Sequence, residues 1–251
     1  MKVRRVALAV MAVASVVVSA HGASAQDQTT ECTWPTPAPA IHVNVVVPED
    51  ATCNLSDSTV TGSVFVKPGG ELCAGEDECD SMMAQDEGGV VINGNLQADA
   101  PRWIELRSSE IDNNVQIVGT QSSPGMTSMQ PNAICDASRI GGNLSIIESL
   151  GDAPWRLGED EMDMGMMSYC EDSVLIEGNT AFSGNDALIE VFRNRPLPDR
   201  GFLGNVSFTD NTGGVEVHDN DIEGSLFCRG NEPPANSSGN AAERFEGECQ
   251  G

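Results

Sequence analysis

The segment Met162-Asp163-Met164-Gly165-Met166-Met167 holds the most distinctive chemistry of the chain. Thioethers are soft ligands that select Cu(I), and the spacing of Met162, Met164, Met166 and Met167 is typical of extracytoplasmic copper-handling segments. The same side chains also serve as adaptable packing groups, which is the interpretation that we favour, or as an oxidisable or sticky surface for a partner. Copper binding by these four methionines is therefore one hypothesis beside packing.

Acidic clusters raise a second metal hypothesis, Ca²⁺. The candidate segments are Glu76-Asp77-Glu78, Thr209-Asp210-Asn211 and His218-Asp219-Asn220-Asp221. Calcium takes six to eight oxygen ligands, but none of these segments has the EF-hand spacing. Solvated surface charge is the simpler interpretation, so Cu and Ca are hypotheses and no cofactor is established.

A carbohydrate-active enzyme, either a polysaccharide lyase or a glycoside hydrolase, is the alternative from another functional class. A glycosidase needs two carboxylates on one face, which Asp210, Asp219 and Asp221 offer only loosely. A lyase acting on uronates needs cationic side chains, but after the N-terminal segment the chain has Lys67 and scattered arginines. Since no nucleophile-elbow, zincin or phosphate-loop motif occurs, we favour a non-enzymatic protein.

The first 25 residues predict a cleaved signal peptide. Met1-Lys2-Val3-Arg4-Arg5 is basic, residues 6–18 are apolar, and Ala23-Ser24-Ala25 is a small-residue cleavage site. The apolar run is too short to span a bilayer, which takes roughly 20 residues. The sequence therefore predicts a secreted or cell-surface protein without membrane insertion.

Acidic side chains dominate the remaining chain, which keeps 10 basic against 38 acidic groups, a net charge of about −28. This field repels nucleic acids, anionic lipids and polyanionic sugars. We expect a protein or cell-surface partner, or cation binding.

Eight cysteines in an exported chain predict disulfides. Without a C-x-x-C pair, zinc binding is a poor interpretation. The preferred pairs are Cys32 with Cys53, Cys73 with Cys79, Cys135 with Cys170, and Cys228 with Cys249, although the sequence cannot prove this connectivity. The first and last pairs would hold the two ends of the fold.

A repeated pattern determines the expected architecture: an aliphatic residue, any residue, Gly or Asn, Asn or Ser, then usually an aliphatic residue. The seven copies begin at Val60, Ile92, Ile111, Ile140, Ile176, Phe202 and Ile222. Short alternating strands with Asn/Gly corners separate them, and no helical period is visible. Such units must stack on their neighbours to bury a face.

The geometry that fits is all-β: a single right-handed parallel β-helix of about seven coils, with a β-sandwich or propeller as alternatives. The fourth repeat position would stack as an asparagine ladder flanked by serines, namely Ser63, Asn95, Asn114, Asn143, Asn179, Asn205 and Ser225. The Gly or Asn before it suits a corner with positive φ. We expect Asn143→Ala or Asn205→Ala to cost roughly 1–3 kcal/mol through unpaired buried partners.

The expected domain organisation is a signal peptide over 1–25, a proline-rich tether over 26–40 and the β-helix over 41–251. Insertions are expected at about 73–89, 118–133 and 158–173, and they contain every methionine after the signal peptide. An Asp-Ala-Pro motif, at Asp99 and again at Asp152, precedes the second and third insertions. We therefore expect these two insertions at one edge of the rod.

The chain resembles the right-handed parallel β-helix proteins, the architecture of pectate lyases and polygalacturonases. It is most similar to small exported bacterial β-helix proteins of uncharacterised function, through Leu226-Phe227-Cys228-Arg229-Gly230-Asn231, Pro233-Pro234 and Gly247-Glu248-Cys249. The resemblance covers about residues 53–251 and implies a fold without an activity. The expected function is a non-enzymatic scaffold for surface interaction, or for cation binding through acidic Met-rich loops.

Overall fold

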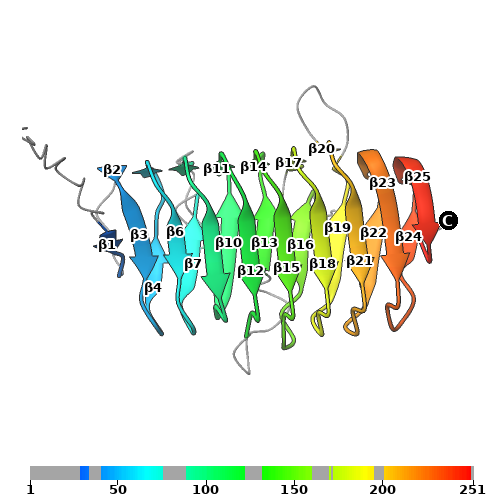
Figure 1. The fold of residues 1–251 in the computed structure, drawn as a ribbon, viewed down its shortest axis with the longest axis horizontal. Helices are drawn as coiled ribbons and strands as arrows, with labels where there is room; N and C mark the ends of the chain where they lie inside the picture. The colour runs from blue at the N-terminus through cyan, green and yellow to red at the C-terminus, as the bar shows by residue number, and fades with distance from the viewer. Residues whose placement is uncertain are drawn as a thin grey trace, which may run out of the picture.

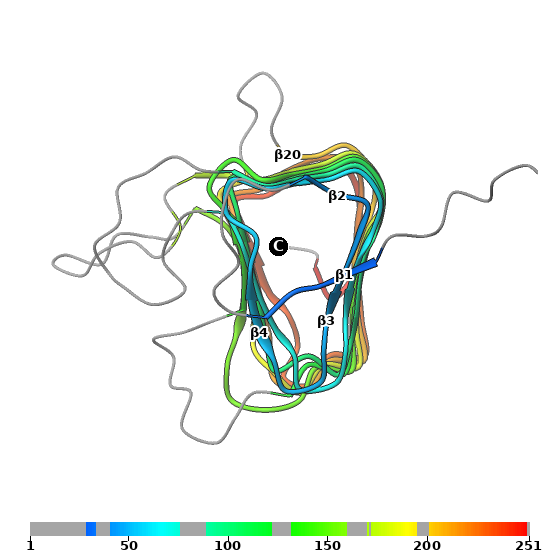
Figure 2. The ribbon, with the colours of Figure 1, turned by 90° about the vertical axis from the view of Figure 1, so that its left-hand side faces the viewer.

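The protein is a parallel β-helix (Figures 1 and 2). The computed structural model describes residues 29–33, 41–75, 89–121, 132–159, 170, 172–194 and 201–249. All elements in these ranges are β-strands, in one sheet of 17 strands and one of eight. Equivalent strands of successive coils pair in parallel, so the predicted fold class is confirmed.

Each coil contributes three strands joined by three corners. The first strands lie in the 17-stranded sheet and are β2 (Ile41–His42), β5 (Thr59–Val60), β8 (Val91–Ile92), β11 (Glu110–Ile111), β14 (Arg139–Ile140), β17 (Leu175–Ile176) and β20 (Gly201–Phe202). The second strands share that sheet and are β3 (Asn44–Val47), β6 (Val64–Val66), β9 (Leu96–Asp99), β12 (Val115–Val118), β15 (Leu144–Ile147), β18 (Thr180–Ser183) and β21 (Val206–Thr209).

The third strands form the eight-stranded sheet. They are β4 (Thr52–Asn54), β7 (Glu71–Ala74), β10 (Trp103–Arg107), β13 (Asn132–Cys135), β16 (Trp155–Gly158), β19 (Ile189–Phe192), β22 (Val215–His218) and β24 (Asn236–Ser238). In the last complete coil the first and second strands are continuous as β23 (Asp221–Arg229). We call the corner between first and second strands corner 1, the next corner 2, and the corner leading to the following coil corner 3.

Strands at the two ends extend the 17-stranded sheet. β25 (Ala241–Gly247) pairs with β23 at the C-terminal end. At the other end β1 (Thr29–Glu31) pairs with β3, so these three residues of the expected tether belong to the sheet. Residues 34–40 lie outside the described residues.

The core of the rod consists of columns of apolar side chains that stack from coil to coil. The aliphatic residue of the repeat stacks in register from coil to coil, as for Ile111, Ile140 and Ile176, which are all buried. The rings of Phe182 and Phe208 stack in the same way, with centroids 5.0 Å apart. Because burial of one such side chain contributes about 1.5–3 kcal/mol, the repeated columns account for the cohesion of neighbouring coils.

The structure has eight coils, one more than the repeat copies in the sequence. The additional coil begins at β2, where His42 takes the place of the aliphatic residue. Its corner 1 has two residues between His42 and Val45, whereas the corner between Val60 and Val64 has three. The shortened corner hid this coil from the sequence pattern.

Three predicted disulfides are present: Cys32–Cys53, Cys135–Cys170 and Cys228–Cys249, with Cα–Cα distances of 5.4, 5.5 and 5.2 Å. Cys73 is also disulfide-bonded, and its predicted partner Cys79 lies outside the described residues. The first and last bridges lie at the two ends of the rod, as expected. Disulfides are typical of an oxidising, extracytoplasmic environment.

The predicted asparagine ladder is present at corner 1. Oδ1 of each asparagine accepts the backbone N–H of the next ladder residue, for example 2.9 Å from Asn143 N to Asn114 Oδ1. The side-chain amides donate hydrogen bonds in the same direction; for example, the distance from Asn205 Nδ2 to Asn179 Oδ1 is 2.9 Å. We call Asn95, Asn114, Asn143, Asn179 and Asn205 the exposed ladder; Asn44 and Ser63 continue it at one end and Ser225 at the other.

Two expectations about corner 1 are wrong. Asn114, Asn143, Asn179 and Asn205 are solvent-exposed, so their partners are not buried as the stability argument assumed. The preceding glycines do not have positive φ. They are required for close approach instead, because a Cβ on Gly204 would lie 2.3 Å from the carbonyl oxygen of Gly178.

Two further ladders, which the repeat did not predict, lie inside the rod. At corner 2, Nδ2 of Asn185 donates to Oδ1 of Asn211, and Nδ2 of Asn211 donates to Oδ1 of Asn231; both distances are 2.8 Å. At corner 3 the same bonds of 2.9 Å connect Asn194, Asn220 and Asn240. We call these six residues the buried ladders; the first five are at most 5% exposed.

Residues with left-handed backbone direct the buried ladders inward. Asp210 (φ 54°) precedes Asn211, and Asp219 (φ 56°) precedes Asn220. The glycines before Asn231 and Asn240 have the same conformation, which Gly, Asp and Asn tolerate best. The positive φ expected at corner 1 therefore occurs at corners 2 and 3.

The two kinds of ladder should differ in their contribution to stability. Asn211→Ala leaves two donors of Asn185 without their acceptor in the core, so we expect the free energy of unfolding to fall by about 3 kcal/mol or more. Asn143→Ala exposes its partners to water, and we expect a loss of about 1 kcal/mol or less. Urea unfolding of both variants measures this, and equal losses would contradict the distinction.

Candidate functional site

The predicted copper ligands Met162, Met164, Met166 and Met167 lie outside the described residues, as do the remaining insertion methionines. The structure therefore shows only where these segments join the rod. The first and third insertions leave at corner 3, after β7 and β16. The second leaves at corner 2, after β12, so the expected shared edge for the second and third insertions is wrong.

The acidic residues considered for calcium binding or glycoside hydrolysis do not form one site. Asp210 lies at corner 2, whereas Asp219 lies at corner 3 and Asp221 begins β23, with β22 between the two corners. Glu76, Asp77 and Glu78 lie outside the described residues. Within the described ranges no three His, Cys, Asp or Glu side chains come together in a way that could hold a metal ion.

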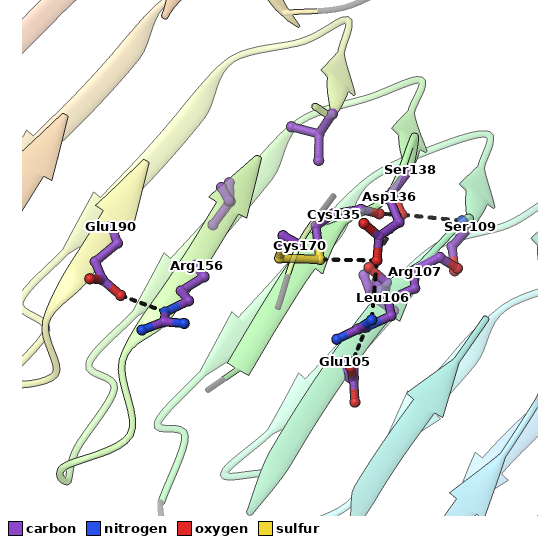
Figure 3. Close-up of a disulfide and its surroundings, with 12 residues drawn as sticks. Glu105, Leu106, Arg107, Ser109, Cys135, Asp136, Ser138, Arg156, Cys170 and Glu190 are labelled. Carbon is purple, nitrogen blue, oxygen red and sulfur yellow. Dashed lines mark hydrogen bonds and ion pairs between the residues drawn. A yellow bond between two sulfur atoms is a disulfide. The ribbon is translucent and has the colours of Figure 1, made fainter. Parts of the chain in front are cut away.

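A compact charge cluster lies on the outer side of the eight-stranded sheet (Figure 3). Arg107 forms ion pairs with Glu105 at a distance of 2.5 Å and with Asp136 at 3.3 Å. All three side chains are less than 15% exposed. The Cys135–Cys170 disulfide lies beside it, with Cys135 Sγ 3.6 Å from Asp136 Oδ2. This is a contact rather than a hydrogen bond, because a disulfide sulfur carries no hydrogen.

The cluster suits a structural role. One arginine pairs with both carboxylates and joins two neighbouring coils. Ala133, Cys135 and Cys170 form a small buried apolar group on the same outer side. Sequence reasoning missed the cluster because Glu105, Arg107 and Asp136 come from two coils and share no motif.

Further ion pairs connect neighbouring coils. Arg156 on β16 pairs with Glu190 on β19 over 2.7 Å (Figure 3). Arg139 on β14 forms ion pairs with Glu177 at 2.5 Å and with Glu110 at 2.9 Å. The hydrogen bond that Arg139 donates to Glu177 is the main reason why the pKa of Arg139 is raised above its ordinary value.

The outward side of the second strands differs from the other sides because its central column carries no charge. In register from β3 to β23, this column consists of Val46, Phe65, Gln97, Gln116, Ser145, Ala181, Ser207 and Phe227. In the neighbouring column the uncharged residues are Val118, Ile147, Ser183 and Thr209. The register partners at the two ends of this column are charged, Asp99 beside Val118 and Arg229 beside Thr209. We call these twelve uncharged residues the neutral face, and they are all partly or fully exposed. The second strands that carry them, such as β3, form the right-hand side of the rod in Figure 2.

Charge begins where the neutral face ends. The register partner of Val46 on β1 is Glu31, and that of Phe227 on β25 is Glu246. The outward residues of the first strands and the positions that follow them carry six carboxylates against Arg139: Glu110, Asp112, Glu177, Asp221, Glu223 and Glu243. The neutral face is thus a flat uncharged strip on a strongly acidic chain.

The chain pattern also keeps this strip regular. Corner 1 contains three residues in every coil from Val60 to Leu226. All stretches beyond residue 41 that lie outside the described residues, up to residue 249, begin and end at corner 2 or corner 3. Each central residue of the neutral face follows its ladder residue by two positions, a signal that an alignment of the repeats would reveal.

Removal of Arg107 should test whether the charge cluster is structural. Arg107→Met takes the shared cation from two nearly buried carboxylates, and we expect the free energy of unfolding to fall by about 3 kcal/mol. Arg139→Met is the control, since its ion pairs are about one-third exposed or more and should contribute about 1 kcal/mol or less. Urea unfolding compares them, and an unchanged midpoint for Arg107→Met would contradict the structural role.

The part of the chain that the structure describes has no helix with the length and apolarity that a membrane crossing requires. A comparison with protein-family models found no match, and comparisons with curated proteins and with solved structures found none either.

Proposed function

We propose that the protein is an exported, non-enzymatic β-helix scaffold that binds an uncharged macromolecular surface through its neutral face. The observation that supports this is the uninterrupted uncharged column from Val46 to Phe227 on a chain with a net charge of −25. Partners that carry charge would be bound more strongly by a charged strip, so the absence of charge selects an uncharged partner.

The composition of the strip suits binding rather than simple solvation. About half of its side chains are apolar, among them Phe65, Ile147 and Phe227, and the rest are hydroxyls and amides. A parallel sheet usually has both faces covered, whereas here the outward side chains of the neutral face are partly or fully exposed. Exposed apolar strips rimmed by polar groups mark interaction sites.

Export is part of the proposal and is supported by the basic and apolar N-terminal segment together with the three disulfides. The partner would then lie at a cell surface or in the extracellular medium. Cation binding by the Met-rich segment is a separate prediction, which concerns residues outside the described ranges.

Charges placed on the neutral face should abolish binding. The double variant Ser145→Glu/Ala181→Glu places two carboxylates in the contact, where their desolvation should weaken binding at least about tenfold. Leu203→Glu/Asn93→Glu is the matched control, because both residues are exposed on the acidic side of corner 1. Cosedimentation with insoluble envelope material from the producing cells measures the bound fraction.

We expect the wild type and the control to cosediment and the face variant to remain in solution. Added salt should not weaken wild-type binding, because the contact contains no ion pairs. The proposal is wrong if the wild type does not bind, or if the two double variants bind equally.

A further inference from the structure

The exposed ladder adjoins the neutral face and offers a row of hydrogen-bond donors. Each of its asparagines precedes a second strand directly, so the row follows the rod axis at a spacing of roughly 4.8 Å per coil. Four coil steps separate Asn95 from Asn205, a span of roughly 19 Å. The row and the neutral face together form one continuous exposed surface.

Hydrogen-bond accounting shows what this row can still bind. The Oδ1 of Asn114 already accepts two bonds, from N and Nδ2 of Asn143, over 2.9 and 3.1 Å. The Oδ1 of Asn179 likewise accepts both donors of Asn205. Each amide nitrogen carries two hydrogens, of which the ladder uses one. From Asn114 to Asn205 each amide therefore keeps one N–H that the ladder does not use, whereas the carbonyl oxygens from Asn95 to Asn179 each accept two bonds.

The buried ladders provide an internal comparison. There both amide hydrogens are used, since Nδ2 of Asn211 donates to Asn231 Oδ1 and to the carbonyl of Phe182. Nδ2 of Asn194 donates in the same way to Asn220 and to the carbonyl of Leu157. Spare donors are thus a property of the exposed ladder and not of asparagine stacking as such.

We infer that the partner of the neutral face is an extended neutral polysaccharide that lies along the rod axis; this rests on the proposed function. Its hydroxyl and ring oxygens would accept from the exposed ladder. Its C–H surfaces would pack on the outward apolar side chains of Val118, Ile147 and Ala181. Repeating sugar units match a surface that repeats once per coil.

Other occupants fit less well. A second copy of this chain would bring a further net charge of −25 and would place its own donor row at the interface. A polyanion has suitable acceptors, but the acidic chain repels it. A neutral polysaccharide supplies acceptors without charge, and it is the class that both observations select.

Binding of linear neutral β-glucan oligosaccharides of increasing length provides the test, with polygalacturonate as the anionic comparison. Calorimetry should show binding that strengthens with length up to the span of the ladder, and no binding of polygalacturonate. Asn143→Ser/Asn179→Ser removes two of the amide nitrogens that carry the unused N–H groups, and Ser63 and Ser225 show that serine fits this corner. We expect this variant to bind at least about tenfold more weakly.

Asn236→Ser is the matched control, because Asn236 is exposed on β24 of the other sheet, and it should bind like the wild type. The inference is wrong if no neutral glucan binds, or if the ladder variant and the control bind equally. If no neutral glucan binds but Ser145→Glu/Ala181→Glu still abolishes cosedimentation with envelope material, the polysaccharide inference is wrong and the proposed function stands. A dimer in sedimentation equilibrium that Ser145→Glu/Ala181→Glu dissociates would identify a second copy as the occupant.

Discussion

Every corner of a β-helix turns the backbone out of its strand ladder, and the polar groups left there must find partners in the next coil. In this protein asparagine side chains supply them along three columns, one outside the rod and two inside, and serines such as Ser138 do so at other corners. A buried polar group without a partner costs roughly 1–3 kcal/mol, so the inner columns restrict which residues can follow the left-handed positions. Coil register, corner shape and core composition all depend on these bonds.

The same constraint divides the surface into variable and constant parts. Corners 2 and 3 carry the insertions in some coils and the buried ladders in others, whereas corner 1 keeps one form from Val60 onward. Close backbone approach, as at Gly204, leaves no room for a side chain there. The second strands that follow therefore begin in identical register, which makes the neutral face flat and continuous.

The repeat predicted the fold class, the core columns and the exposed ladder, because their residues recur with a visible spacing. It missed the buried ladders, since Asp210-Asn211 and Asp219-Asn220 look like polar surface turns and a dipeptide does not reveal burial. The first coil was missed because its corner is one residue shorter. The charge cluster and the neutral face depend on which coils lie side by side, and that follows only from strand register.

The ladders also have opposite directions. In the exposed ladder each later coil donates to the earlier one, whereas in the buried ladders the earlier coil donates to the later one. In the buried ladders each coil therefore presents amide donors to the coil that follows it in the sequence. Glu248 ends one of these columns, because its carboxylate accepts from the backbone of Gly230 and from Asn231 and has no hydrogen to pass on. The carboxylate of Glu248 therefore satisfies the last amide of this column without a further coil.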